Sequence, residues 1–226
     1  AEERSEHKPL GFVAVAAGPG MAKILESLGV DVVVSGGQTM NPSTKDLLDA
    51  VERVNADAVI ILPNNSNIIM AAQSAAGLSE VPCAVVPTKS VPQAFSALFS
   101  ADETASLEEN VENMTSAFAD TKTGEVTTAI KDSKDAHDNP IHNGDVIGIA
   151  DGSIEAVGSS VEDVVMSLLD TMEAEDADTL TLLAGEDFSD EQLDALVERI
   201  ESRFDELEVD AHRGEQPLYP IVFSVE

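Results

Sequence analysis

Short apolar segments alternate with amphipathic segments through the first hundred residues. The apolar segments are six to nine residues long, and we expect them to form strands at 11–18, 30–36, 57–65 and 83–88. Helical patterns follow them at 19–29, 43–54, 66–77 and 91–100. Strands that are apolar on both faces and alternate with helices predict a parallel sheet covered on both sides.

The predicted helix 43–54 has a start signal and an apolar stripe. Ser43 is followed three residues later by Asp46, as in a capping box. The stripe consists of Leu47, Leu48, Val51 and Val54.

The second half has a different rhythm. It predicts helices at 105–121, 159–172 and 189–204, and strands at 124–132, 145–158, 179–186, 207–214 and 219–226. Ser159 with Glu162 and Ser189 with Gln192 offer two further capping boxes. The polar stretch near residues 101–106 interrupts the apolar periodicity. The prediction is therefore α/β: a flexible start at 1–10, a parallel Rossmann-like lobe at 11–102 and a mixed α/β lobe at 103–226.

Charge and composition narrow the function classes. The chain has 226 residues, with 43 acidic and 12 basic ones, for a formal net charge of -31. Such a surface repels nucleic acid and anionic membranes, because both are bound through Lys and Arg. No apolar run approaches the ~20 residues of a membrane span, and no signal peptide is visible, so we expect a cytoplasmic protein. The charged start at Ala1 suggests a piece of a longer chain.

The loops that follow parallel strands open on one edge of the sheet, where ligands of such sheets bind. Ten residues of the second and third of these loops are candidate ligand- or partner-binding residues: Gly36, Gly37, Gln38, Thr39, Met40, Asn41, Ser43, Thr44, Asn64 and Asn65. Asn67 and Lys89 complete the set, and Lys89 is the one cation on this rim. Backbone N–H groups and a helix N-terminus suit an anion. Polar groups that only cap helices and satisfy one another explain the same composition equally well.

Other chemistry has weaker support. No P-loop pattern occurs, and the glycines at 18 and 20 lack the full dinucleotide-binding spacing. His137 and His142 lie in a segment rich in Asn, Pro and Gly, which is typical of a turn, so we expect no metal site. The single Cys83 is expected to be a buried small hydrophobe. No catalytic residue is assigned.

Three loop motifs carry a family resemblance. "GGQTMNPST", "ILPNNSNIIMAAQSA" and "AVVPTKSVPQAFSAL", followed by "GEVTTAIKDS", "GDVIGIADGSI" and "LTLLAGED", resemble the C-terminal region of the fatty acid kinase A protein. This group is also described as dihydroxyacetone-kinase-like. The resemblance covers the chain from about Gly11 to its end and implies the two-lobed DegV-like fold.

The resemblance also implies a division of labour. ATP and Mg²⁺ would bind a kinase domain outside this chain, with no cofactor in this region. A separate DegV-like subunit would carry the fatty acid, whose acyl-phosphate feeds phospholipid synthesis. The first hypothesis is accordingly a non-catalytic docking and regulatory domain for that subunit. The alternatives are a DegV-like module that itself holds a fatty acid or phosphorylated small molecule at the loop rim, and a kinase or phosphatase acting on a dihydroxyacetone-like substrate.

Overall fold

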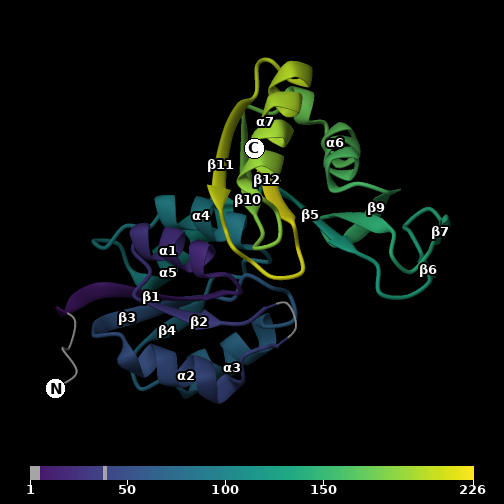
Figure 1. Cartoon of the computed structure of the whole chain (residues 1–226). Helices are drawn as coiled ribbons and strands as arrows, with labels where there is room; N and C mark the ends of the chain where they lie inside the picture. Colours follow the sequence, from purple (N-terminus) through teal and green to yellow (C-terminus); the bar gives the residue numbers. More distant parts are fainter. Residues whose placement is uncertain (1–5, 38–39) are drawn as a thin grey trace. The chain divides into compact units, whose positions relative to one another are not determined.

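The computed structural model describes residues 6–37 and 40–226 (Figure 1). The chain divides into two compact units, the first ending at Asp120 and the second running from Thr121 to Glu226. The sequence pattern placed this boundary after residue 102 and assigned residues 1–10 to a flexible start. The structure instead begins the first strand at Lys8.

The first unit contains a parallel sheet of four strands in the order β2-β1-β3-β4, which confirms the parallel lobe predicted from the sequence. Figure 1 shows α2 and α3 on one face of this sheet and α1, α4 and α5 on the other. The strands are β1 (Lys8–Ala16), β2 (Val32–Ser35), β3 (Ala56–Leu62) and β4 (Cys83–Val85); the helices are α1 (Pro19–Ser27), α2 (Thr44–Arg53), α3 (Ile69–Leu78), α4 (Val91–Phe99) and α5 (Leu107–Ala117).

The core of the first unit follows from strands that are apolar at consecutive positions. Val13 and Val15 of β1 pack with Leu47 and Val51 of α2, all of them buried. Phe12, at the alternate position of β1, is buried as well. Residues at alternate positions of a strand point to opposite faces of the sheet. Because both sets are buried, this sheet needs helices on both faces.

Helix α5 belongs to the first unit because its polar residue Asn110 is fully buried there. The Asn110 side chain accepts a hydrogen bond from the backbone N–H of Asp102 and donates one to the Asp102 carbonyl, both at 2.8 Å. These bonds tie the polar linker to α5. The apolar periodicity lapses at residues 101–106, but the chain does not leave the first unit until residue 120.

The second unit is a mixed sheet of six strands in the order β11-β10-β12-β5-β8-β9, with α6 and α7 packed against it. Only β10 and β11 pair in parallel; the other neighbours are antiparallel. The elements are β5 (Lys122–Thr128), β8 (Val146–Ala150), β9 (Ser153–Gly158), α6 (Val161–Thr171), a 3-10 turn at Ala174–Asp176, β10 (Thr179–Ala184), α7 (Asp190–Arg203), β11 (Glu208–Arg213) and β12 (Ile221–Val225).

Serine side chains cap the start of several helices. The predicted capping boxes of α2 (Ser43 with Asp46) and α7 (Ser189 with Gln192) are confirmed. For α6 the prediction of Ser159 is wrong, because Ser160 is the residue directly before the first helical residue. Its Oγ accepts the N–H of Asp163 at 3.2 Å. Two adjacent serines each have an acid three residues on, and only the helix start distinguishes them.

Candidate functional site

The parallel topology places four strand-to-helix loops at the carboxyl edge of the first sheet. These are residues 17–18, 36–43, 63–68 and 86–90, and we call them the loop rim. Ten of the twelve candidate residues lie in the described part of the chain and belong to the rim or to the first residue of α2. The other two, Gln38 and Thr39, lie outside the described residues.

Asn64 is the central polar group of the rim. It is buried and adopts a left-handed backbone (φ 58°), which asparagine tolerates better than most residues. Its side-chain Nδ2 donates to the carbonyl oxygen of Val15 at 2.8 Å. Its Oδ1 accepts from the hydroxyl of Thr88 at 2.7 Å, and its own N–H donates to the same hydroxyl oxygen at 3.1 Å. Asn64 therefore joins the end of β1 to the loops after β3 and β4.

The sequence pattern did not single out Thr88, although it lies beside the candidate Lys89. Thr88 is fully buried, and both of its bonds to Asn64 cross 24 residues of sequence. The only local signal is a hydroxyl residue directly after a buried strand. That signal does not identify the partner.

A second set of bonds links the loops after β2 and β3. The Asn65 side chain donates through Nδ2 to the carbonyl of Gly37 and accepts through Oδ1 from the N–H of Asn67 at 2.8 Å. The Gly37 N–H donates to the Met40 carbonyl at 2.9 Å, which closes the loop on itself. At Gly36 (φ 151°) a Cβ would lie 2.8 Å from the Met40 carbonyl oxygen, so the loop requires glycine there.

The N-terminus of α2 is occupied by the protein's own carboxylate. The backbone N–H of Ser43 donates to Asp46 Oδ2 at 2.9 Å, and Ser43 Oγ accepts from the Asp46 N–H at 3.1 Å. Hydrogen bonds from the Ser43 backbone and then its side chain lower the pKa of the Asp46 carboxyl. Thr44 is the first helical residue and is half-buried. An anionic ligand at this helix start would have to displace Asp46.

The outward side of the rim is partly apolar. Met40 is 77% exposed in the loop after β2, and Met70 is 79% exposed in the first turn of α3. Asn41 and Lys89 are also exposed, and the Lys89 N–H donates to Gln93 Oε1 at 2.8 Å. The rim therefore combines polar groups bonded to one another with one exposed methionine, Met40, and the first turn of α3 next to it adds a second, Met70.

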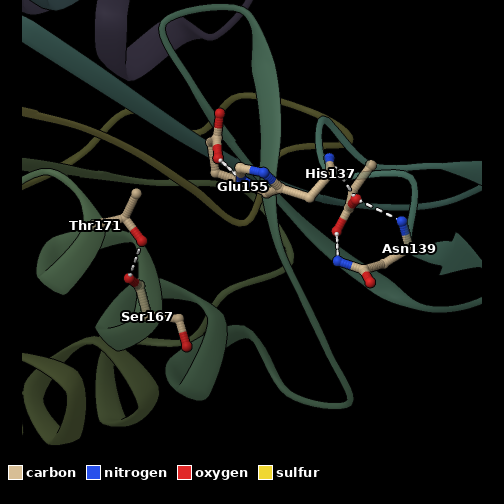
Figure 2. Close-up of polar contacts among 6 residues, drawn as sticks. His137, Asn139, Glu155, Ser167 and Thr171 are labelled. Atoms are coloured by element: carbon tan, nitrogen blue, oxygen red, sulfur yellow. Dashed lines mark hydrogen bonds and ion pairs between the residues drawn. The ribbon is translucent and has the colours of Figure 1, made fainter.

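The histidine segment of the second unit forms a small two-stranded arm rather than only a turn (Figure 1), and Figure 2 shows polar contacts of this arm. Its strands are β6 (Ser133–Lys134) and β7 (Pro140–Ile141). Asp135 accepts hydrogen bonds from the backbone N–H of His137 at 2.8 Å and of Asn139 at 2.9 Å, and these bonds help to lower the pKa of its carboxyl against the opposing effect of desolvation. His137 Nε2 lies 2.8 Å from Glu155 Oε2 on β9.

The side chains of the arm are not grouped as a metal site among the described residues. Within residues 6–37 and 40–226, no three His, Cys, Asp or Glu side chains are grouped as metal ligands would be. His142 contributes its backbone N–H to Asp145 at 2.9 Å. The segment is accounted for as an ordered hairpin arm.

Cys83 lies half-buried in β4, and burial raises the pKa of its thiol to about 11. A thiol with so high a pKa is almost entirely protonated near neutral pH and is a poor nucleophile. The sequence predicts a buried residue, whereas the structure leaves Cys83 only half-buried, on the last strand of the first sheet.

Comparisons with known proteins identify the family. A family model for the C-terminal region of fatty acid kinase A-like proteins matches residues 11–226. The chain belongs to this family. It is 44% identical to protein YloV of Bacillus subtilis over 220 residues, which is 97% of this chain and 39% of YloV. It is 37% identical to an uncharacterized Staphylococcus aureus protein over 226 residues, or 41% of that protein. The chain thus spans about two-fifths of the length of these relatives.

The fold is that of the DegV family. A DegV family protein from Corynebacterium glutamicum superimposes with a TM-score of 0.66 at 15% identity, covering 96% of this chain and 97% of that one. A Streptococcus pneumoniae fatty acid kinase B3 protein loaded with linoleic acid gives 0.61 at 12% identity, covering 96% and 99%. DegV of Bacillus subtilis, described as a fatty acid binding protein, gives 0.64 at 9% identity, covering 96% and 99%. Identities this low establish the fold alone.

The helices in the described part of the chain are too short or too polar for any of them to cross a membrane.

Proposed function

We propose that this chain is the docking domain of a fatty acid kinase and binds, through its loop rim, a separate DegV-like subunit that carries the fatty acid. The remaining three-fifths of the longer relatives would supply the ATP- and Mg²⁺-dependent kinase activity. In this proposal the domain performs no chemistry itself and positions the carrier for phosphorylation of its lipid carboxylate. Family membership over residues 11–226 supports the kinase connection.

The observation that supports the docking role is that polar side chains of the rim are already hydrogen-bonded within the protein. The side chains of Asn64, Asn65 and Thr88 form hydrogen bonds within the rim or to the strand end beside it. A small polar ligand would have to break these bonds, and each broken buried bond costs about 1–3 kcal/mol. A protein partner can use the outward side of the rim without breaking them.

Exposed methionine is well suited to such a contact. Met40 lies in the loop after β2, and Met70 lies in the first turn of α3. The Asn65–Gly37 hydrogen bond joins the loops that precede α2 and α3. Methionine side chains are flexible and polarizable, which lets them adapt to another protein surface. The net charge of -31 favours a partner whose docking face is basic.

The second candidate function is a DegV-like module that holds a fatty acid or phosphorylated small molecule at the rim. Lys89 favours it, because this exposed cation has no ion-pair partner among the described residues and lies directly before the Ser90 cap of α4. The N-terminus of α2 disfavours it, since Asp46 already occupies that position.

Titration calorimetry with a matched pair of variants tests the docking proposal. The titrant is the fatty-acid-loaded DegV-like protein of the same organism. Met40→Asp on the rim should weaken binding at least about tenfold, because it places a charge in the proposed apolar contact. Leu78→Asp is the control: Leu78 is 65% exposed at the end of α3, at the opposite edge of the sheet.

Four outcomes distinguish the two candidate functions. Loss of affinity in Met40→Asp with wild-type affinity in Leu78→Asp supports docking through the rim. Equal affinities in all three proteins would place the contact elsewhere. Absence of binding by the wild-type chain would refute the docking function. A bound anion lost in Lys89→Ala would favour the second candidate.

A further inference from the structure

A groove lies along the free edge of the first sheet, between β4 and α5. It has a volume of about 650 Å³. Two residues of β4 and one face of α5 line it: Cys83, Ala84, Leu107, Glu108, Val111, Glu112, Thr115 and Ser116. Leu107, Val111 and Thr115 recur every four residues, so a single helical stripe forms this wall. All of these residues belong to the first unit.

The strand beside the groove has an open edge. β4 is the last strand in the order β2-β1-β3-β4 and pairs with β3 alone. The Pro82 carbonyl accepts from the Val59 N–H at 3.0 Å, and the Val86 N–H donates to the Ile61 carbonyl at 3.1 Å. Backbone groups alternate in direction along a strand. The N–H and C=O groups of the two intervening odd-numbered residues of β4 therefore point away from β3.

These outward groups belong to Cys83 and Val85. Pro87 is the next outward-facing position, and proline has no N–H with which to extend the ladder. The open edge is therefore short. A protein surface normally blunts longer exposed edges to avoid uncontrolled pairing. A short open edge that ends at a proline, with an apolar wall beside it, has the features used to receive one added strand.

The charge of the groove selects among possible occupants. Glu108 and Glu112 are exposed, and no Lys or Arg lines the groove. A fatty acid has the apolar tail that the wall requires, but its carboxylate would face two glutamates without a cation. Alternate side chains of a strand point to opposite faces of the sheet, so only one face of an added strand meets α5. A strand that carries both apolar and basic residues on that face places its apolar side chains on Leu107 and Val111 and its cations near the glutamates.

We propose that the β4–α5 groove binds an extended segment of a protein partner, in which apolar and basic side chains share one face of the strand, by adding it as a fifth strand to the sheet. Backbone bonds to Cys83 and Val85 supply the register, the wall of α5 receives the apolar side chains, and Glu108 and Glu112 select the charge. This surface is separate from the loop rim, and the proposal does not depend on the docking function assigned to the rim.

The test uses the 226-residue chain, labelled with ¹⁵N, and a synthetic hexapeptide with lysine, valine and lysine at positions 1, 3 and 5, separated by threonine, so that valine and the basic residues share one face. We expect saturable shifts of the Cys83 and Val85 amide signals with a Kd on the order of 1 mM or below. The matched peptide with glutamate in place of the basic residues should cause no shift. Raising the salt concentration should weaken the binding, since the glutamates are exposed.

Two further experiments distinguish strand addition from nonspecific electrostatic attraction. The double variant Glu108→Lys, Glu112→Lys should weaken binding about tenfold or more, whereas Glu26→Lys, Glu52→Lys, on α1 and α2, should not change it. Two peptides N-methylated at alternate backbone nitrogens should differ, because only one of them loses the N–H groups that face β4. The comparison of the N-methylated peptides needs no protein variant, so it remains decisive if a variant fails to fold.

The following results would overturn the proposal: no amide shift at about 5 mM peptide, equal binding of the acidic peptide, or equal binding of both N-methylated isomers. Oleate that shifts the same two amides more strongly than the basic peptide would assign the groove to a lipid instead.

Discussion

The Asn64–Thr88 pair gives the strongest quantitative prediction for the loop rim. Thr88→Val keeps the volume and shape of the side chain and removes only the hydroxyl. The hydroxyl donates to Asn64 Oδ1 at 2.7 Å and accepts from the Asn64 N–H at 3.1 Å. The substitution therefore leaves one acceptor and one donor unpaired, and Asn64 is only 9% exposed.

The expected loss follows from counting these groups. An unpaired buried polar group costs about 1–3 kcal/mol, so two of them lower the free energy of unfolding by roughly 2–4 kcal/mol if water reaches one of them in part. A cavity adds nothing, because valine fills the same space. Asn64→Ala should be comparably damaging, and Asn64→Gly should be milder by about 1 kcal/mol because glycine accepts the left-handed backbone.

The assay must report on the first unit alone, because two units need not unfold together. Hydrogen exchange followed by mass spectrometry on peptides covering β1 and β3 meets this need. A loss of 2–4 kcal/mol accelerates exchange through global opening of that unit by about 30- to 1,000-fold, at ten-fold per 1.4 kcal/mol. Asn67→Ala is the control, since Asn67 is exposed and only its backbone N–H bonds to Asn65. An acceleration of less than about threefold for Thr88→Val would refute the view that this pair holds the rim together.

Three further predictions follow from local geometry. Ser160→Ala should lower the free energy of unfolding of the second unit by about 1 kcal/mol, measured by hydrogen exchange on peptides of that unit, and Ser159→Ala should not, because only Ser160 caps α6. The rate at which the Cys83 thiol reacts with a disulfide reagent should rise about tenfold for each pH unit between 7 and 10 and level off only near pH 11. In urea, where the chain is unfolded, the rate should level off near pH 8.5. Equal pH profiles in the two conditions would contradict the raised pKa of about 11. Gly124→Ala should lower the free energy of unfolding by about 1–3 kcal/mol or more, since its Cβ would lie 2.1 Å from the phenylalanine ring of β12. Gly77→Ala in α3 should raise the free energy of unfolding by about 0.5–1 kcal/mol, because nothing lies within 4 Å of the added Cβ. Equal shifts of the thermal unfolding midpoint would contradict both.

Periodicity was sufficient to predict the first sheet. Consecutive apolar residues such as Val13 and Ala14 point to opposite faces, and both are buried. That pattern admits few arrangements other than a parallel sheet between helices. The capping residues Ser43 and Ser189 were also predictable, because the capping bond spans three residues of sequence.

The remaining features depend on contacts between distant residues. Asn64 was selected as a candidate, but its bond to Thr88 spans 24 residues and leaves no periodic signal. Asn110 fixes helix α5 to the first unit through a buried side chain in a helix whose sequence is mostly polar. The β4–α5 groove was not predicted for the same reason, since its walls come from residues 83–84 and 107–116.

Native mass spectrometry of the purified chain, alone and mixed with the fatty-acid-loaded DegV-like protein of the same organism, tests the docking function most directly. We expect a stoichiometric complex in which the lipid mass belongs to the partner and this chain carries no ligand of its own. A chain that arrives with a bound lipid or phosphate mass and forms no complex with the loaded partner would contradict the docking function and make the loop rim a ligand site.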